Sequence, residues 1–329
     1  MSEERIERTF QVKLPARLSI GNIRGSVVVQ PGEESGPGEG VISIIAVKHA
    51  DTGNAVLTQI EIVQDANGGV RVSTHFGQSS AGFLTWLFSL GMNRPCKVDY
   101  TVRAPRSCSV SVDCVSSSAS VEGLEGQFNL KTVSGALVMR RLSGSLAANT
   151  VSGEVRGQAV SGRADLHTVS GAVELVEADL PAVTASSVSG RMSLETTTLG
   201  PGPYHFNSVS GNVRLAIPSG AGCRIEMHKI SGQLHTSLPV TYQKQIPGGE
   251  TVEIQGGGPL VRFNTTSGSL DLAAVGGRQA VAASIPAVVA VSNSQEHRRQ
   301  VLERIAHGDL SPEEGLKELD LKELDLKEL

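Results

Sequence analysis

The sequence predicts an all-β protein: a parallel β-solenoid (β-helix) with an antiparallel β elaboration near the N-terminus and a small C-terminal helical hairpin. Three observations support this fold class. Val-Ser-Gly or a close variant recurs at regular intervals, apolar residues keep fixed positions around each copy, and aromatic residues make up only 3% of the 329 residues while glycine occurs 37 times. A core poor in aromatic side chains must be thin, which is typical of a repetitive β architecture.

The repeat is clearest in residues 129–171, where a serine that precedes glycine returns every nine residues. The stronger copies define a longer coil of 18 to 21 residues, followed by one step of 36 residues. This long step contains residues 239–259, which we expect to form a hairpin inserted into one coil. The serines of the stronger copies are Ser134, Ser152, Ser170, Ser189, Ser210, Ser231 and Ser267.

Alignment on these serines predicts two short strands in each coil. Apolar residues stand six and four positions before the serine and three and five positions after it, and residues two apart point to the same side of a strand. The residue directly before the serine is also apolar in most coils, so we expect it to be buried. The Ser-Gly step breaks the alternation and marks a corner, where glycine can adopt a positive φ. The nine-residue spacing favours two faces per coil, while the longer coils leave three faces open.

Outside the repeat, two regions have different patterns. The first 106 residues contain one coil-like stretch (18–30) and longer alternating runs, and Asn67-Gly68-Gly69 predicts a hairpin turn. Near the C-terminus, Ser311 and Pro312 are typical of a helix start. We therefore expect four regions: an N-terminal β region (1–106), the regular stack (107–275), a linker (276–295) and a helical module (296–329).

Composition excludes several classes of protein. The formal net charge is −4, and nine acidic and four basic residues between positions 303 and 329 account for −5, so the rest of the chain has no basic footprint for nucleic acid. The four cysteines are scattered without a CxxC pair, which argues against a disulfide framework or a zinc site and fits a reducing compartment. Without an apolar leader or a run long enough to span a bilayer, the chain is expected to be cytoplasmic, with peripheral membrane contact as an alternative.

Three stretches carry a family resemblance: FQVKLPARLSIGNIRGSVVV (10–29), VDYTVRAPRSCSVSVDCVSSSASVEGLEG (98–126) and the serial TVSG coils. Together they resemble the bacterial "putative adhesin" β-strand-repeat family, a domain of unknown function that is also found in envelope-stress proteins of Lia type. The resemblance covers about residues 8–275. The tail 296–319 is similar to the short helical C-terminal (SHOCT-like) module that often accompanies this domain. The family implies no catalytic residue, and its name implies surface exposure.

The first candidate site is a column of polar residues three positions before each serine. The side chains could stack as a ladder that satisfies backbone groups at the corners, or they could bind a glycan or a protein partner. The candidate ladder residues are Asn149, His167, Asn207 and His228.

The second candidate site is the uncharged stretch 79–93, which contains the single tryptophan of the chain. Its apolar residues share one face of a short helix, which could cap an end of the rod, dock a partner or insert at a membrane surface. The residues of this candidate contact are Phe83, Leu84, Trp86, Leu87 and Phe88.

Together these patterns predict a non-enzymatic scaffold or binding module without cofactors, metal ligands or catalytic residues. It would assemble with itself or with a protein partner through its ends, the Trp86 segment or the C-terminal helices. The alternatives are a polymer-forming protein of bactofilin type and an envelope-stress sensor or adhesin. A polysaccharide-active β-helix enzyme is disfavoured, because carboxylates in the rod occur singly rather than in the pair that glycoside hydrolysis needs.

Overall fold

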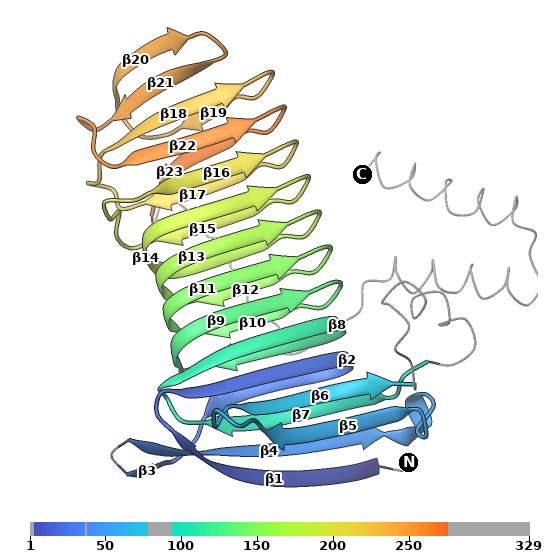
Figure 1. Cartoon of the computed structure of the whole chain (residues 1–329). Coiled ribbons are helices and arrows are strands. Elements are labelled where there is room, and N and C mark those ends of the chain that lie inside the picture. The colour runs from blue at the N-terminus through green and yellow to red at the C-terminus, as the bar shows by residue number, and fades with distance from the viewer. Residues whose placement is uncertain (1–2, 37, 78–93, 276–329) are drawn as a thin grey trace, which may run out of the picture. The chain divides into compact units, whose positions relative to one another are not determined.

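The computed structural model describes residues 3–36, 38–77 and 94–275, which lie in one compact unit, Met1–Gly277. The described residues form 23 strands of one connected sheet and a single short 3-10 helix, η1 (Ala50–Thr52), with no α-helix among them. Figure 1 shows most of these strands stacked one above another.

The stack has two faces, each built from parallel strands. From β8 to β17, strands pair with their equivalents one coil further along, so that Thr132 stands opposite Thr150 and Thr150 opposite Thr168. Two longer strands, β2 (Ala16–Pro31) and β8 (Cys108–Glu122), run across both faces and pair with each other along most of their length. The first face contains β9 (Glu125–Thr132), β11 (Ser143–Thr150), β13 (Ser161–Thr168), the second half of β14 (Val173–Ser187) and β16 (Tyr204–Ser208); the second face contains β10 (Leu137–Arg140), β12 (Val155–Gln158), the first half of β14, β15 (Met192–Thr196) and β17 (Val213–Ile217).

The predicted fold class needs correction. Strands β8, β9, β11, β13, β14, β12 and β10 form a closed ring of parallel pairings with the other strands outside it. The ring closes at β8 and β14, which each lack a Ser-Gly pair. Each of these two strands therefore continues through a corner at which the strands of other coils end. The fold is all-β as expected, but the C-terminal helical hairpin is no part of it. Residues 296–329, on which that hairpin is predicted, lie outside the described residues.

The last coils do not stack in the order of the chain. The final coil consists of β22 (Leu260–Thr265) and β23 (Leu270–Ala274), and it lies between the coil of β16 and β17 and the earlier coil of β18 (Cys223–Lys229) and β19 (Leu234–Thr236). Strand β22 pairs in parallel with both β16 and β18, and β23 pairs with both β17 and β19. Figure 1 shows β22 in this position.

Antiparallel strands extend the N-terminal end of the stack and cover the first face at its C-terminal end. At the C-terminal end, β20 (Val240–Ile246) and β21 (Gly249–Ile254) form the hairpin expected in residues 239–259, and β21 pairs antiparallel with β18. At the N-terminal end, β6 and β7 pair with β2, and β4 and β1 continue the sheet in antiparallel pairs. The bounds of these strands are β1 (Glu3–Lys13), β3 (Glu34–Gly36), β4 (Glu39–His49), β5 (Thr58–Gln64), β6 (Val70–Phe76) and β7 (Lys97–Ala104), with β5 and β6 joined at the predicted Asn67-Gly68-Gly69 turn.

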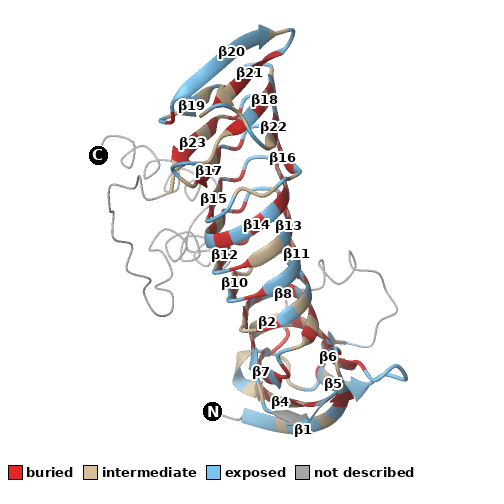
Figure 2. Ribbon diagram, turned by 90° about the vertical axis from the view of Figure 1, so that its left-hand side faces the viewer, coloured by how far each residue is buried: buried red, intermediate tan, exposed pale blue. Residues whose placement is uncertain are grey.

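A narrow core runs between the two faces. Inward-pointing residues of successive strands form one continuous cluster, and buried positions alternate with exposed ones along the strands (Figure 2). Phe206 and Phe263 on neighbouring strands are fully buried, as is Tyr204. Full burial of a large apolar side chain contributes about 1.5–3 kcal/mol, so many small contributions along the stack replace the thick core of a globular domain.

The glycine of each Val-Ser-Gly corner is required by close contact rather than by the positive φ predicted for it. A Cβ atom on Gly153 would stand 2.0 Å from the carbonyl oxygen of Gly135, and one on Gly171 would stand 2.0 Å from that of Gly153. Positive φ angles occur instead at the opposite corners, at Gly144 (131°) and Gly162 (115°). The Val-Ser-Gly corners therefore pack backbone against backbone.

We predict that Gly153→Ala destabilises the protein by about 2–3 kcal/mol, because the added methyl group overpacks a contact between two backbones. Gly220→Ala is the matched control, since a Cβ at Gly220 meets no atom within 4 Å. Urea unfolding followed by circular dichroism measures both variants. Equal unfolding midpoints for the two would contradict the close-contact explanation.

An ion pair between the buried Glu250 and the partly buried Lys229 joins the capping hairpin to β18, the outermost strand of the first face. The Lys229 Nζ atom lies 2.5 Å from Glu250 Oε1, and Gln243 Nε2 donates to Glu250 Oε2 at 3.0 Å. Burial alone would raise the pKa of the Glu250 carboxyl, but the hydrogen bonds from Lys229 and Gln243 and the charge of Lys229 outweigh it, and the pKa falls below its ordinary value of 4.5.

Because the folded protein holds the pKa of Glu250 below its unfolded value, the carboxylate contributes stability that is present above about pH 4.5 and is lost as the pH falls through the folded pKa. We predict that Glu250→Gln lowers the melting temperature at pH 7 and reduces its decrease between pH 5 and pH 3, pH values chosen to bracket the titration of a paired carboxyl. Glu253→Gln on the same strand, whose carboxylate is 4.0 Å from Arg224, serves as the control and should change both quantities less. An unchanged acid response in Glu250→Gln would contradict this assignment.

Candidate functional site

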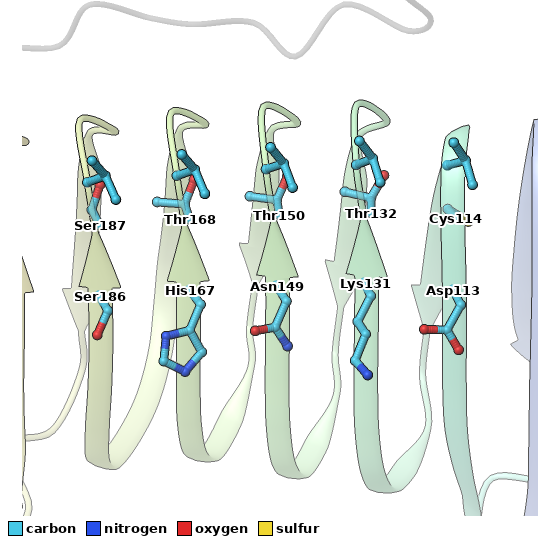
Figure 3. A pocket seen from close by; sticks show the side chains of 15 residues that line it. Asp113, Cys114, Lys131, Thr132, Asn149, Thr150, His167, Thr168, Ser186 and Ser187 are labelled. Atoms are coloured by element: carbon cyan, nitrogen blue, oxygen red, sulfur yellow. The ribbon is translucent and has the colours of Figure 1, made fainter. Parts of the chain in front are cut away.

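A groove of about 540 Å³ runs along the outer side of the first face, across five adjacent strands (Figure 3). It has a polar wall, an apolar wall and a floor, and each strand together with the corner that follows it contributes one residue to each. The polar row is Asp113, Lys131, Asn149, His167 and Ser186; the valine ridge is Val115, Val133, Val151, Val169 and Val188; the floor is Cys114, Thr132, Thr150, Thr168 and Ser187.

The valine ridge contradicts the prediction that the residue before each serine is buried. Val151 and Val169 are each 45% exposed, whereas Thr150 and Thr168, one residue earlier, are only 5% exposed. The strand alternation continues unbroken up to the corner, so the threonine points inward and the valine must point outward. The prediction followed the hydrophobicity of valine instead of this alternation.

The buried threonines are accommodated because they close the corner. Thr150 Oγ1 accepts a hydrogen bond of 2.9 Å from the backbone N–H of Gly153, and Thr168 Oγ1 accepts the same bond from Gly171. Ser187 replaces threonine in the next coil and accepts from Gly190 at 2.8 Å. A hydroxyl-bearing residue at this position thus satisfies a backbone donor that has little access to water.

The repeated serine joins one coil to the previous one. Ser152 donates to the carbonyl oxygen of Val133 through its backbone N–H at 2.9 Å and through its hydroxyl at 3.2 Å. Ser170 makes the same pair of bonds to Val151. Since these hydroxyls are held against backbone carbonyls, they act in the architecture of the stack and have no position as nucleophiles.

The structure divides the four predicted ladder residues between two places. Asn149 and His167 lie in the groove, while Asn207 and His228 lie beyond it, on β16 and β18. Beyond the groove, Asn264 Nδ2 donates to Asn207 Oδ1 at 2.9 Å, a contact between stacked side chains of the kind that a ladder requires.

Inside the groove, the polar row is largely unpaired. His167 Nε2 is 3.1 Å from Asp165 Oδ1, but Asp113, Lys131, Asn149 and Ser186 have no side-chain hydrogen bond or ion pair within the described part of the chain. These groups include an anion, a cation, an amide and a hydroxyl, so this wall can both donate and accept. The groove therefore offers free polar groups on one side and exposed apolar methyl groups on the other.

Sulfur chemistry is not available at the groove floor. All four cysteines are buried and free, and burial raises the pKa of the Cys114 thiol in the floor. Burial likewise raises the pKa of Cys108 to about 12 and that of Cys223 to about 11. A thiol that stays protonated is a poor nucleophile and a poor metal ligand. In the described ranges, no three His, Cys, Asp or Glu side chains gather in a metal-binding arrangement.

Two further polar clusters lie near the N-terminal end. Asp99 accepts from Ser26 Oγ at 2.7 Å and lies 2.7 Å from His49 Nε2, so the serine contacts the carboxylate and not the imidazole, unlike a nucleophile–base pair. Inside the sheet, Tyr100 OH and Thr74 Oγ1 are 2.6 Å apart, and burial raises the pKa of Tyr100 to about 12. Both clusters hold strands together.

The second predicted site cannot be placed. Phe83, Leu84, Trp86, Leu87 and Phe88 lie outside the described residues, and their contact role stays a prediction. None of the described elements is a helix long and apolar enough to cross a membrane.

Comparisons with known proteins identify a family. The model of the family described as Toastrack DUF4097 matches residues 109–273, half of the chain, and supports the resemblance to a bacterial family of unknown function. The Lia-type relationship and the SHOCT-like module stay predictions. None of the curated proteins matches the chain significantly.

The solved structures that match this chain are distant in sequence. A "putative adhesin" of Bacteroides fragilis NCTC 9343 is 15% identical over 82% of this chain and 97% of its own, with a TM-score of 0.47. A "putative adhesin" of Parabacteroides distasonis ATCC 8503 is 9% identical over 81% and 97%, with a TM-score of 0.38. A "putative lipid binding protein" of the same organism is 11% identical over 82% and 96%, with a TM-score of 0.35.

We predict that Thr150→Val destabilises the protein by about 1–3 kcal/mol, because it leaves the buried N–H of Gly153 without its acceptor. Thr150→Ser is the control, since serine fills this position in other coils and keeps the hydroxyl. The serine variant should lose no more than the contribution of one methyl group, about 0.8 kcal/mol. Urea unfolding measures both, and a serine variant as unstable as the valine variant would contradict the role of the hydroxyl.

Proposed function

We propose that this chain, which belongs to the Toastrack DUF4097 family, is a non-enzymatic binding module whose protein partner lies along the groove. The observation that carries the proposal is the pairing of an exposed valine ridge with an unpaired polar row over five coils. If the polar row only stabilised the corners, its side chains would be hydrogen-bonded to the corner backbone, as the floor threonines are.

The valine ridge supplies the affinity in this proposal. Val133, Val151, Val169 and Val188 are 38–47% exposed and succeed one another at the strand spacing of about 4.8 Å. Isolated exposed apolar residues are ordinary, but a continuous apolar stripe beside polar groups is typical of a binding surface. The polar row opposite would fix the orientation of the partner, since its groups must be matched by donors and acceptors once water is excluded.

A protein partner fits this groove better than a glycan. Among the described residues its lining contains no phenylalanine, tyrosine or tryptophan, whose side chains supply large, rigid contact surfaces at many recognition sites. A polypeptide can place apolar side chains against the ridge while its amide groups meet Asn149, Ser186 and Lys131. A polypeptide would therefore contact both the valine ridge and the polar row.

The geometry of the ends favours side-on binding over the alternative of a bactofilin-type polymer. The N-terminal end of the stack finishes in antiparallel strands and β21 covers β18 at the C-terminal end, so within the described residues the parallel edge of a Val-Ser-Gly coil is open only at the three-residue strand β19. The outermost N-terminal strand, β1, carries Glu3, Glu4, Arg5, Glu7 and Arg8, and charged edge strands resist edge-to-edge pairing. An envelope-stress or adhesin role and the cytoplasmic location stay predictions.

The arrangement of acidic residues supports a non-enzymatic role. Asp165 lies on the first face, on β13, while Glu174 lies on the second face, on the first half of β14. Carboxylates on opposite faces cannot flank one glycosidic bond. In the described part of the chain His167 contacts the carboxylate of Asp165 and no nucleophile, and the nearby corner serine Ser170 is bound to a backbone carbonyl.

The proposal is tested by photocrosslinking in cells that make the protein. A photoreactive amino acid replaces Val151 or Val169 in the full chain, and the adduct is identified by mass spectrometry and then confirmed with the purified partner. We expect a discrete protein adduct from both positions, and a weaker affinity when Asn149 and His167 are both replaced by serine. The position of Val209 is the matched control, because it occupies the same corner and is 48% exposed but lies outside the groove. Equal adducts from Val209, or none from the groove, would overturn the proposal.

A further inference from the structure

The displaced order of the last coils creates a slot that one coil fills. Strands β16 and β17 form the lower side of the slot, and β18 and β19 form the upper side. Residues 260–274 occupy it, with parallel pairing to both sides on each face. The chain thus builds the two sides of the slot first and reaches the residues that fill it only after the capping hairpin.

The filling coil follows the same pattern as its neighbours. Val261, Phe263, Leu270 and Leu272 are fully buried, and Thr265 Oγ1 accepts from the N–H of Gly268 at 2.7 Å as in other corners. A copy of this coil from another molecule would therefore make identical contacts in the slot. Because the exchanged coil makes the same contacts in either molecule, exchange costs little free energy. The connecting segment alone then decides whether the monomer or the exchanged dimer is favoured.

That connecting segment, residues 255–259, has the features of a hinge. Four successive residues, Gln255 to Gly258, have positive φ angles between 51° and 155°. Three of them are glycines, for which this conformation is unstrained, and Gly256 has no neighbour within 4 Å of a built Cβ. The three glycines therefore allow changes of backbone direction that residues with a side chain would resist.

Gln255 adds local strain to the closed connection. It is a non-glycine residue at a φ of 51°, and its Oε1 atom is buried without a hydrogen-bond partner, although its Nε2 donates to Ser219 O at 2.8 Å. Both features are unfavourable in the compact connection and would be relieved if the segment opened. Short connections under strain favour exchange of the element that follows them.

We propose that residues 260–274 are an exchangeable coil, and that a second copy of this chain supplies the coil in a reciprocal dimer. Each molecule would extend residues 255–259, place its coil in the partner's slot and receive the partner's coil in return. This inference is independent of the groove, which lies on earlier coils of the stack.

Introduced cysteines test the exchange in the full-length protein. Asn207 and Asn264 are exposed register partners on β16 and β22, where the strand spacing of about 4.8 Å falls within the Cα separations that a disulfide spans. Two singly substituted proteins, Asn207→Cys and Asn264→Cys, are mixed, held in reductant at the urea concentration where unfolding begins, returned to buffer and oxidised. The four native cysteines are buried and do not compete.

We expect a dimer linked between Cys at 207 of one chain and Cys at 264 of the other, identified by peptide mass spectrometry. The control is a mixture of Ser145→Cys and Arg163→Cys, exposed register partners on β11 and β13, which stack in chain order. The 207–264 link should form in several-fold excess over the 145–163 link. The absence of such an excess would overturn the proposal. The doubly substituted chain Asn207→Cys/Asn264→Cys must also form its internal disulfide, because the proposal assumes that these two positions are neighbours; failure to form it would overturn the proposal as well.

Discussion

The contact between successive Val-Ser-Gly corners is the constraint on which the rest of the structure depends. Each corner glycine lies so close to a backbone carbonyl oxygen of the adjacent coil that no side chain fits between them. The neighbouring serine then bonds the backbone of the preceding coil, and the threonine closes its own corner. Together these contacts hold every coil at one distance and in one register, so residues 18 or more positions apart form straight rows.

The groove follows directly from this register. Once Thr150 is turned inward to cap Gly153, Asn149 and Val151 on either side of it must both point outward. Repetition of this arrangement converts a local turn into two parallel walls. The same residues that make the corner stable thus determine where the polar row and the valine ridge stand, while the identities of the outward side chains remain free to vary for binding.

Sequence patterns predicted the all-β class, the coil length and most inward positions, because these depend on alternation and on the size of glycine. They misplaced Val151 and its equivalents, because valine was assigned to the interior by its hydrophobicity although Thr150 has the buried hydrogen bond. They also could not reveal the displaced last coil. The coils around Ser210, Ser231 and Ser267 share the same apolar positions, so each fits beside either of the others, and no pattern in the sequence distinguishes the orders.

The two functional features occupy different parts of the stack, and this separation has a consequence for assembly. The groove spans the strands from β8 to β14, which stack in chain order, whereas the exchangeable coil lies between β16 and β18. Exchange would replace one coil by an identical one and leave Asn149, His167 and the valines between them in the same register. Self-association through the slot would therefore give a dimer with two grooves, each in the register of the single chain. A dimer of this kind would present two equivalent surfaces to a partner, and binding at two linked sites strengthens attachment without any new contact.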